Sequence, residues 1–177
     1  MRIPITAGED DLDQRLLENV SALRRYAMFL CGDMSRSDDL VQETLVRVLA
    51  HARAWRPIKD LRAYLFTTLH NVFIDSNRRY HARVSDQPVE ALLVDHVSPA
   101  SQSQRIEIRE LVEALQKIPT EQRETVLLVG LEGMSYAEAA KILGVPIGTV
   151  MSRLSRGREA LRRLTDRSSV SQLRVVK

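Results

Sequence analysis

The chain has 177 residues, of which 44% are hydrophobic and 28% are charged, and its formal net charge at pH 7 is +3. This composition predicts a soluble cytoplasmic protein with one ordinary domain or two small ones. No apolar run approaches the roughly 18 residues of a membrane span, and the N-terminus lacks the hydrophobic core of a signal peptide. Cys31 is the only cysteine, which excludes an intrachain disulfide and a cysteine-based zinc site.

The first half of the chain has the hydrophobic periodicity of three helices. Residues 1–11 are predicted to form a loose arm. Apolar residues then recur at helical spacing over 12–30, and Gly32 ends this helix. A basic loop that contains Trp55 separates the second helix from the third, which we expect over 61–79.

The second helix is predicted to begin with Ser35 or Ser37, because serine at a helix start accepts a hydrogen bond from a free backbone amide. Asp38 and Asp39 would then lie in the first turn, where the helix dipole favours negative charge. Adjacent carboxylates can also bind a metal ion, but at such a position a dipole partner is the preferred interpretation.

The composition changes over residues 84–105, which contain two prolines and several Ser and Gln with little periodicity. We predict a linker there. Helical periodicity returns before Pro119, and a further helix is expected from Pro119 to Gly133. No segment shows the alternation of a strand. The predicted fold class is therefore all-α, with two small helical domains joined by a flexible linker.

Residues 135–164 have the pattern of a helix-turn-helix. Ser135 and Glu138 have the spacing of a capping box, Gly144 suits a left-handed helix end, and Pro146 prevents continuation. The following helix has one apolar face. Its opposite face and flanks carry Gly148, Thr149, Ser152, Arg153, Ser155, Arg156 and Arg163. Small polar groups and Arg on one helix face fit a DNA major groove; the alternative is an ordinary helical hairpin with a solvated basic face.

Three segments in this order resemble the extracytoplasmic-function (ECF) sigma factors, the small two-domain members of the bacterial sigma family. They are DDLVQETLVRVL at 38–49, DLRAYLFTTLHNVFIDSNRR at 60–79, and the segment 118–161 that includes the helix-turn-helix. The resemblance covers about residues 12–165. The implied organisation is an arm at 1–11, a sigma region 2 domain of three or four helices at 12–83, a linker at 84–105, a sigma region 4 helix-turn-helix domain at 106–165 and a tail at 166–177.

The resemblance also implies partners for particular residues. Asp39, Leu40, Gln42 and Glu43 match the surface that docks on the clamp helices of the largest subunit of core RNA polymerase. An acidic, amide-rich face suits a protein better than DNA, which would repel it. Without the resemblance, a solvated acidic face would be the default interpretation.

Two further sets match DNA-reading positions of the family. The −10 element of the promoter is assigned to Trp55, Arg56, Arg62, His70, Asn71 and Arg78. The −35 element is assigned to Gly148, Thr149, Ser152, Arg153 and Arg156. A tryptophan in a basic loop can stack on an unpaired base, but Trp55 can equally anchor its loop on the helical core. Asn71 either helps to form the base pocket or bonds to the backbone.

The sequence departs from the family pattern at two positions of the second helix. Family members often carry Lys or Arg where this chain has Met151, and a larger side chain where it has Ser155. Both differences weaken the expected contact with DNA. They bear on the promoter sequence and the strength of −35 binding rather than on the DNA-binding role itself.

The predicted function is that of an alternative sigma factor, with promoter DNA, core RNA polymerase and an anti-sigma protein as partners. No membrane insertion, small-molecule substrate, metal or cofactor is expected, and no catalytic motif appears among the scattered histidines. One alternative is a decoy that sequesters an anti-sigma factor, although such decoys usually carry a receiver domain, for which 177 residues leave no room. Another is an operator-binding regulator, which would leave the segment 38–79 without a role.

Overall fold

The computed structural model of the protein describes residues 7–53, 58–83 and 102–172. These residues form helices and no strand, which confirms the predicted all-α fold class. In chain order the elements are α1 (Ala7–Cys31), α2 (Met34–Arg53), α3 (Leu61–Arg83), α4 (Gln102–Gln116), α5 (Thr120–Val126), the π-helix η1 (Leu127–Leu131), α6 (Tyr136–Leu143) and α7 (Ile147–Gln172). No helix among these residues combines the length and apolarity needed to cross a membrane.

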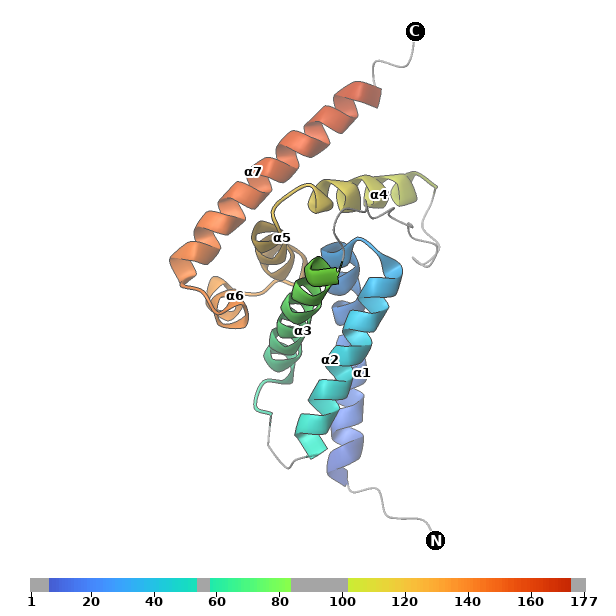
Figure 1. The fold of residues 1–177 in the computed structure, drawn as a ribbon, viewed down its shortest axis with the longest axis vertical. Helices are drawn as coiled ribbons and strands as arrows, with labels where there is room; N and C mark the ends of the chain where they lie inside the picture. Colours follow the sequence, from blue (N-terminus) through green and yellow to red (C-terminus); the bar gives the residue numbers. More distant parts are fainter. Residues whose placement is uncertain (1–6, 54–57, 84–101, 173–177) are drawn as a thin grey trace.

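Helices α1, α2 and α3 pack side by side around one apolar core (Figure 1). Leu23 and Leu30 of α1, Val48 of α2 and Leu65 of α3 have no exposed surface. Burial of this kind is the main favourable term in folding. The predicted apolar faces of the first three helices are therefore the ones that form the core.

Two helix starts differ from the sequence prediction. Helix α1 already begins at Ala7, inside the segment 1–11 for which the sequence predicts a loose arm. Helix α2 begins at Met34, and the Oδ1 atom of Asp33 accepts a hydrogen bond from the backbone N–H of Arg36 at 2.7 Å. The prediction that Ser35 or Ser37 caps this helix is wrong, because Gly32 turns the chain so sharply, at φ 70°, that Asp33 takes that place.

A consequence is that the first turn of α2 contains no acidic residue. The expected dipole role of Asp38 and Asp39 is therefore wrong as well, since both lie beyond that turn. Ser37 is buried, and its hydroxyl donates to the carbonyl of Met34 at 2.8 Å. It closes a helix turn instead of capping the helix.

Helices α4 to α7 form the second half of the fold, with α7 running along α5 and past α4 (Figure 1). The single helix predicted after Pro119 is divided into α5 and η1, where the backbone widens to a π-helix. It ends at Gly133 with φ 67°, as predicted. The widened turn brings Glu132 back toward the first half of the chain.

The two halves pack against each other. Helix α1 contacts α4, α5 and η1, and α3 contacts α6. The cluster of buried apolar residues runs through both halves without a break, from Leu23 and Leu69 in the first to Leu115 and Leu128 in the second. The packing of these halves decides which of the predicted functional residues are accessible.

Candidate nucleic-acid interface

The helix-turn-helix is built as its sequence predicted. The Ser135 Oγ atom accepts a hydrogen bond from the backbone N–H of Glu138 at 3.2 Å, and a Glu138 carboxylate oxygen accepts one from the backbone N–H of Ser135 at 2.8 Å. The hydrogen bonds from Ser135, side chain first and backbone second, lower the pKa of Glu138. Gly144 adopts φ 63° and ends α6, so α7 begins at a fixed angle to it.

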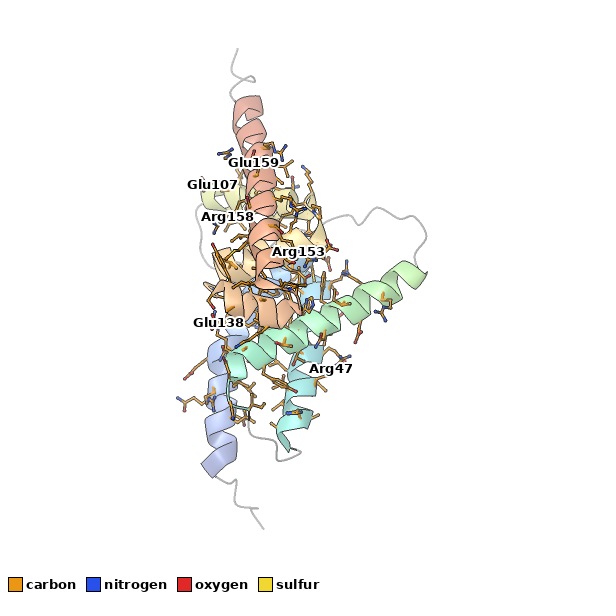
Figure 2. The ribbon with its side chains drawn as sticks, turned by 90° about the vertical axis from the view of Figure 1, so that its left-hand side faces the viewer. Arg47, Glu107, Glu138, Arg153, Arg158 and Glu159 are labelled. Atoms are coloured by element: carbon orange, nitrogen blue, oxygen red, sulfur yellow. The ribbon has the colours of Figure 1, made fainter. Side chains whose placement is uncertain are left out.

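Helix α7 buries one face and exposes the other. Val150 and Leu154 are buried, as predicted. The predicted −35 residues lie together over the first turns of the helix, where Gly148 and Arg156 are exposed and the others are partly exposed. Arg153 is labelled on this helix in Figure 2. The arrangement presents guanidinium groups beside small residues, which is the composition that a major-groove helix requires.

Two apolar side chains accompany this polar face. Ile147 is 47% exposed and Met151 is 48% exposed, at the same end of α7. The hydroxyl of Ser152 donates to the carbonyl of Thr149 at 3.0 Å, so it already has a partner within the helix. The sequence prediction singled out Met151 but gave no role to Ile147.

The predicted −10 residues divide into three groups. Trp55 and Arg56 lie outside the described residues. Asn71 and Arg78 are exposed on α3. Arg62 and His70, also on α3, contact the second half of the chain. Arg62 remains half-exposed despite its contact, whereas His70 is largely buried, so the described residues of this set are accessible except at His70.

Arg62 and His70 each contact an acidic residue that sequence reasoning missed. Arg62 donates to the backbone carbonyl of Glu132 at 2.8 Å, and Nδ1 of His70 lies 2.6 Å from a carboxylate oxygen of Glu124. Nothing in the local sequence pattern identifies these glutamates, because the contacts join residues that are 70 and 54 positions apart.

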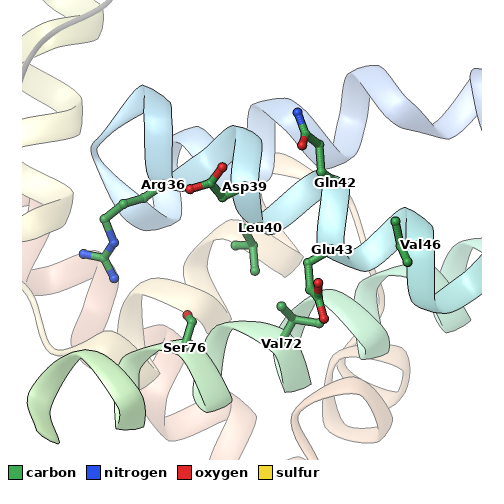
Figure 3. Close-up of a pocket in the computed structure, with 8 residues that line it drawn as sticks. All are labelled: Arg36, Asp39, Leu40, Gln42, Glu43, Val46, Val72 and Ser76. Atoms are coloured by element: carbon green, nitrogen blue, oxygen red, sulfur yellow. The ribbon is translucent and has the colours of Figure 1, made fainter. Parts of the chain in front are cut away.

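The four residues predicted to bind polymerase line a single groove of about 520 Å³ between α2 and α3. In Figure 3, Leu40 and Glu43 of α2 face Val72 and Ser76 of α3. Asp39, Gln42 and Glu43 are exposed, whereas Leu40 is only 5% exposed and forms the floor. Arg36 and Val46 complete the lining, and Val46 is 63% exposed. The groove is thus acidic at its rim, with an exposed apolar side chain at one end.

A family model described as "Sigma-70, region 4" matches residues 108–161, and one described as "Sigma2 domain of PhyR" matches residues 16–70. The ECF RNA polymerase sigma factor EcfG of Rhodopseudomonas palustris is 40% identical over 159 residues, which is 90% of this chain and 86% of that protein. The chain belongs to the ECF sigma factors.

Other relatives agree with this assignment. The ECF sigma factor SigM of Bacillus subtilis is 30% identical over 89% of this chain and 95% of its own length. Among solved structures, the sigma factor RpoE of Bartonella quintana, in complex with the anti-sigma factor NepR, matches with a TM-score of 0.73 and 33% identity. That match covers 94% of this chain and 99% of RpoE.

A second solved structure is CnrH, in complex with the cytosolic domain of CnrY. It matches this ECF sigma factor with a TM-score of 0.65 and 27% identity, over 87% of this chain and 86% of CnrH. These matches confirm the predicted family and its two-part helical fold. The family is one of transcription initiation factors and is not a known enzyme family.

Proposed function

We propose that this ECF sigma factor binds core RNA polymerase and directs it to promoters that carry its −10 and −35 elements. The observation that carries the proposal is the exposed face at the start of α7, where Arg153 and Arg156 lie beside Gly148, Thr149 and Ser152 on a helix-turn-helix of the sigma region 4 family. This face is the proposed reader of the −35 duplex. Arg can hydrogen-bond a guanine through two donors or hold a phosphate, and Ser and Thr can accept or donate to either.

The proposed −10 reader is the exposed side of α3 together with the loop before it. Asn71 and Arg78 are exposed on this helix, and Trp55 and Arg56 lie in the basic loop of the sequence. Strand separation exposes unpaired bases. A stacking aromatic ring and nearby cations can hold such a base and its phosphates, which offsets part of the cost of opening the duplex.

The proposed polymerase contact is the groove between α2 and α3. Asp39 and Glu43 make its rim negative, and Val46 offers exposed apolar area. A protein partner with basic and apolar side chains fits this combination, whereas DNA would be repelled by the carboxylates.

The proposed domain boundaries follow from these roles. Residues 12–83 would form the region 2 domain and residues 106–165 the region 4 domain, joined by residues 84–105. Each domain alone would bind its promoter element weakly. The tether makes the second contact intramolecular, so the two bind together much more tightly than either does alone.

Control by an anti-sigma protein in the cytoplasm is also part of the proposal. RpoE of Bartonella quintana and CnrH were both solved in complex with proteins that bind sigma factors of this fold, NepR and the cytosolic domain of CnrY. Both of those sigma factors match more than four fifths of this chain, which supports a similar inhibitory partner here.

The second candidate function is a decoy for an anti-sigma factor. The match of residues 16–70 to the sigma2 domain of PhyR favours it, because PhyR of Bartonella quintana is described as an anti-anti-sigma factor. A decoy has no use for a basic DNA-reading helix, however. The partly exposed Arg153, the exposed Arg156 and the 40% identity to EcfG therefore favour the sigma factor.

Run-off transcription tests the proposal. Purified bacterial core polymerase is incubated with genomic promoter fragments, with and without the protein. Transcripts that start at defined sites only when the protein is present are the expected result. If no transcripts form but the protein binds an anti-sigma factor tightly, it is a decoy. If it binds specific duplexes without polymerase, it is an ordinary regulator.

A further inference from the structure

Two large apolar side chains at the start of α7 are not part of the proposed −35 face, although both reach the surface. Ile147 and Met151 are 47% and 48% exposed. They are four positions apart, a spacing that places two residues side by side on a helix. Tyr136 of α6 is 38% exposed, and it lines one groove together with Met151. Tyr136, Ile147 and Met151 are called the apolar patch below.

The groove beside the apolar patch has a volume of about 440 Å³ and lies between α6 and α7. Its other lining residues are Leu154, Ser155, Arg158, Glu159 and Arg162. The carboxylate of Glu159 lies 2.7 Å from the guanidinium of Arg162 and 3.6 Å from that of Arg163, so its charge is compensated. The surroundings of the groove are therefore positive, which suits a partner that combines apolar groups with negative charge.

Met151 is surrounded by small residues that belong to the proposed −35 face or its flank. Gly148 precedes it by three positions, and Ser152 and Ser155 follow it by one and four positions. A Cβ added at Gly148 would meet open space. The thioether side chain of Met151 is thus longer than those of its neighbours on this face. A surface that approaches the face can reach it closely.

Basic residues lie on both sides of the same face. In Figure 2, Arg153 and Arg158 are labelled on opposite flanks of α7. At about 100° per residue, Met151, Ser152 and Ser155 lie on the strip between these two arginines. A helix in the major groove has a phosphate backbone on each side and base edges in front of it. The arrangement therefore favours duplex DNA, rather than a protein, as the partner of the apolar patch.

The major groove offers one apolar feature that such a residue can read, the methyl group of thymine. The adenine of the same base pair offers an amino group as a hydrogen-bond donor. The hydroxyl of Ser152 donates to the carbonyl of Thr149 at 3.0 Å, which leaves its oxygen free to accept. Met151 and Ser152 together are therefore complementary to an A·T pair.

We propose that Met151 reads the methyl group of a thymine in the −35 element, while the rest of the apolar patch shields this contact from water. The inference rests on the proposed function and names a base that it discriminates. Family members that carry Lys or Arg at this position offer hydrogen-bond donors there, which suit guanine. The promoters of this chain should differ from theirs at the base pair that faces Met151.

The test uses the complete chain bound to core polymerase and a promoter fragment found by run-off transcription. Each thymine of the −35 element is replaced in turn by deoxyuridine, which pairs as thymine does and lacks only the methyl group. Competition with the unaltered fragment gives the relative affinity. Loss of one buried methyl should weaken binding about fourfold at the position that faces Met151.

Two substitutions connect this effect to the side chain. Met151→Ala should bind the unaltered fragment more weakly than the parent and lose the response to deoxyuridine. Met151→Arg should lose the same response, and its new charge should steepen the slope of log affinity against log salt by about 1 if it contacts a phosphate. Ile106→Ala is the matched control, because Ile106 is 49% exposed on α4, outside the helix-turn-helix. It should retain the response of the parent. Since both positions are about half exposed, all three variants should unfold at the temperature of the parent.

Three results would overturn the inference. They are a −35 element without an A·T pair, a parent that deoxyuridine does not affect at any position, and a Met151→Ala variant that keeps the full response. If Met151→Ala binds the fragment as the parent does but yields fewer transcripts, the apolar patch contacts a protein instead. The proposed function fails separately, when the parent gives no promoter-specific transcripts, and the inference then falls with it. Transcripts without a response to deoxyuridine would leave the proposed function intact.

Discussion

Gly157 of α7 approaches α5 so closely that a Cβ at this position would lie 2.7 Å from the Cγ2 atom of Val126. The same Cβ would lie 3.3 Å from the backbone carbonyl oxygen of Gln122. Helix α7 therefore packs on α5 at a position where a Cβ atom would clash unless its neighbours shift.

Gly157→Ala is expected to destabilise the protein. Overpacking of this kind costs about 1–3 kcal/mol, which exceeds the gain of up to about 1 kcal/mol from replacing glycine in a helix. Gly148→Ala in the same helix is the control, because nothing lies within 4 Å of a Cβ there. Thermal unfolding should give a lower midpoint for the Gly157 variant only. A Gly157 variant as stable as the Gly148 variant would contradict the close packing.

Removing the capping box should weaken the helix-turn-helix. Ser135→Ala leaves the first amides of α6 without their side-chain acceptor, which typically costs about 1 kcal/mol. Ser135→Thr keeps the acceptor and serves as the control. Urea unfolding should detect the loss in the alanine variant, and its affinity for a −35 duplex should fall because α6 supports α7.

The difference in stability between the parent protein and Ser135→Ala should depend on pH. Because hydrogen bonds from Ser135 lower the pKa of Glu138 from its ordinary value of 4.5, the stabilisation is present above that value and is lost as the pH falls through the lowered pKa. The difference in stability between the parent and Ser135→Ala should therefore narrow at acidic pH. A difference that stays constant would mean that the Glu138 carboxylate takes no part.

The helix-turn-helix could be predicted from sequence because its signals are local. Ser135 and Glu138 are three residues apart, and Gly144 takes its φ of 63° within the same turn that ends α6. Helix α2 shows the limit of such reasoning. Several residues near its start can act as caps, and Asp33 takes that role only because Gly32 ends α1 directly before it.

The docking of the halves could not be predicted in this way. Glu132 meets Arg25 across 107 positions of the chain, and the intervening helices decide whether two such charges meet. The π-helix before Glu132 has no clear sequence signal either, since its apolar residues also suit an ordinary helix. The contacts of Arg62 with Glu132 and of His70 with Glu124 join residues 70 and 54 positions apart, so they too have no local sequence signal.

The proposed −35 reader can be tested by removing its guanidinium groups. Arg153→Ala and Arg156→Ala should each weaken binding to a −35 duplex by about 1–3 kcal/mol if the lost contact is to a base. A lost phosphate contact would instead reduce the slope of log affinity against log salt by about 1. Arg109→Ala on α4 removes an exposed arginine of the same half and is the control. If all three variants lose the same affinity for the −35 duplex, the arginines contribute only a general attraction between positive charge and DNA.

Cys31 should behave as a protonated, poorly reactive thiol. Burial raises its pKa to about 11, against the opposing effect of Arg36 and Arg123. Between pH 9 and this value the unfolded thiol ionises and the folded one does not, so the free energy of unfolding should fall as the pH rises. Burial raises the pKa of Tyr26 as well, so this residue adds a pH dependence of its own. The contribution of the thiol is therefore the difference in the free energy of unfolding between the parent protein and Cys31→Ala.

Alkylation provides a direct measurement on this thiol. Iodoacetamide near pH 8 should modify Cys31 slowly in the folded protein and quickly in urea, because the thiolate is the nucleophile. Modification at the same rate in both conditions would show that the thiol is exposed and ionises normally.

The proposed polymerase groove can be tested at its most exposed apolar residue. Val46 is 63% exposed beside the carboxylate of Glu43, whereas Leu17 is 73% exposed on α1 and does not line the groove. Val46 is assigned to the apolar part of the proposed contact, so a carboxylate at position 46 would lose its hydration there against apolar rather than basic side chains, which costs far more than the loss of two methyl groups. Val46→Asp should therefore weaken binding to core polymerase, measured by the displacement of a labelled parent protein, at least tenfold more than Leu17→Asp does (about 1.4 kcal/mol). Both substitutions affect exposed side chains, so similar stability is expected of the two variants. If Leu17→Asp weakens polymerase binding as much as Val46→Asp, the docking surface extends to α1 or lies elsewhere, and the groove between α2 and α3 loses its assigned role.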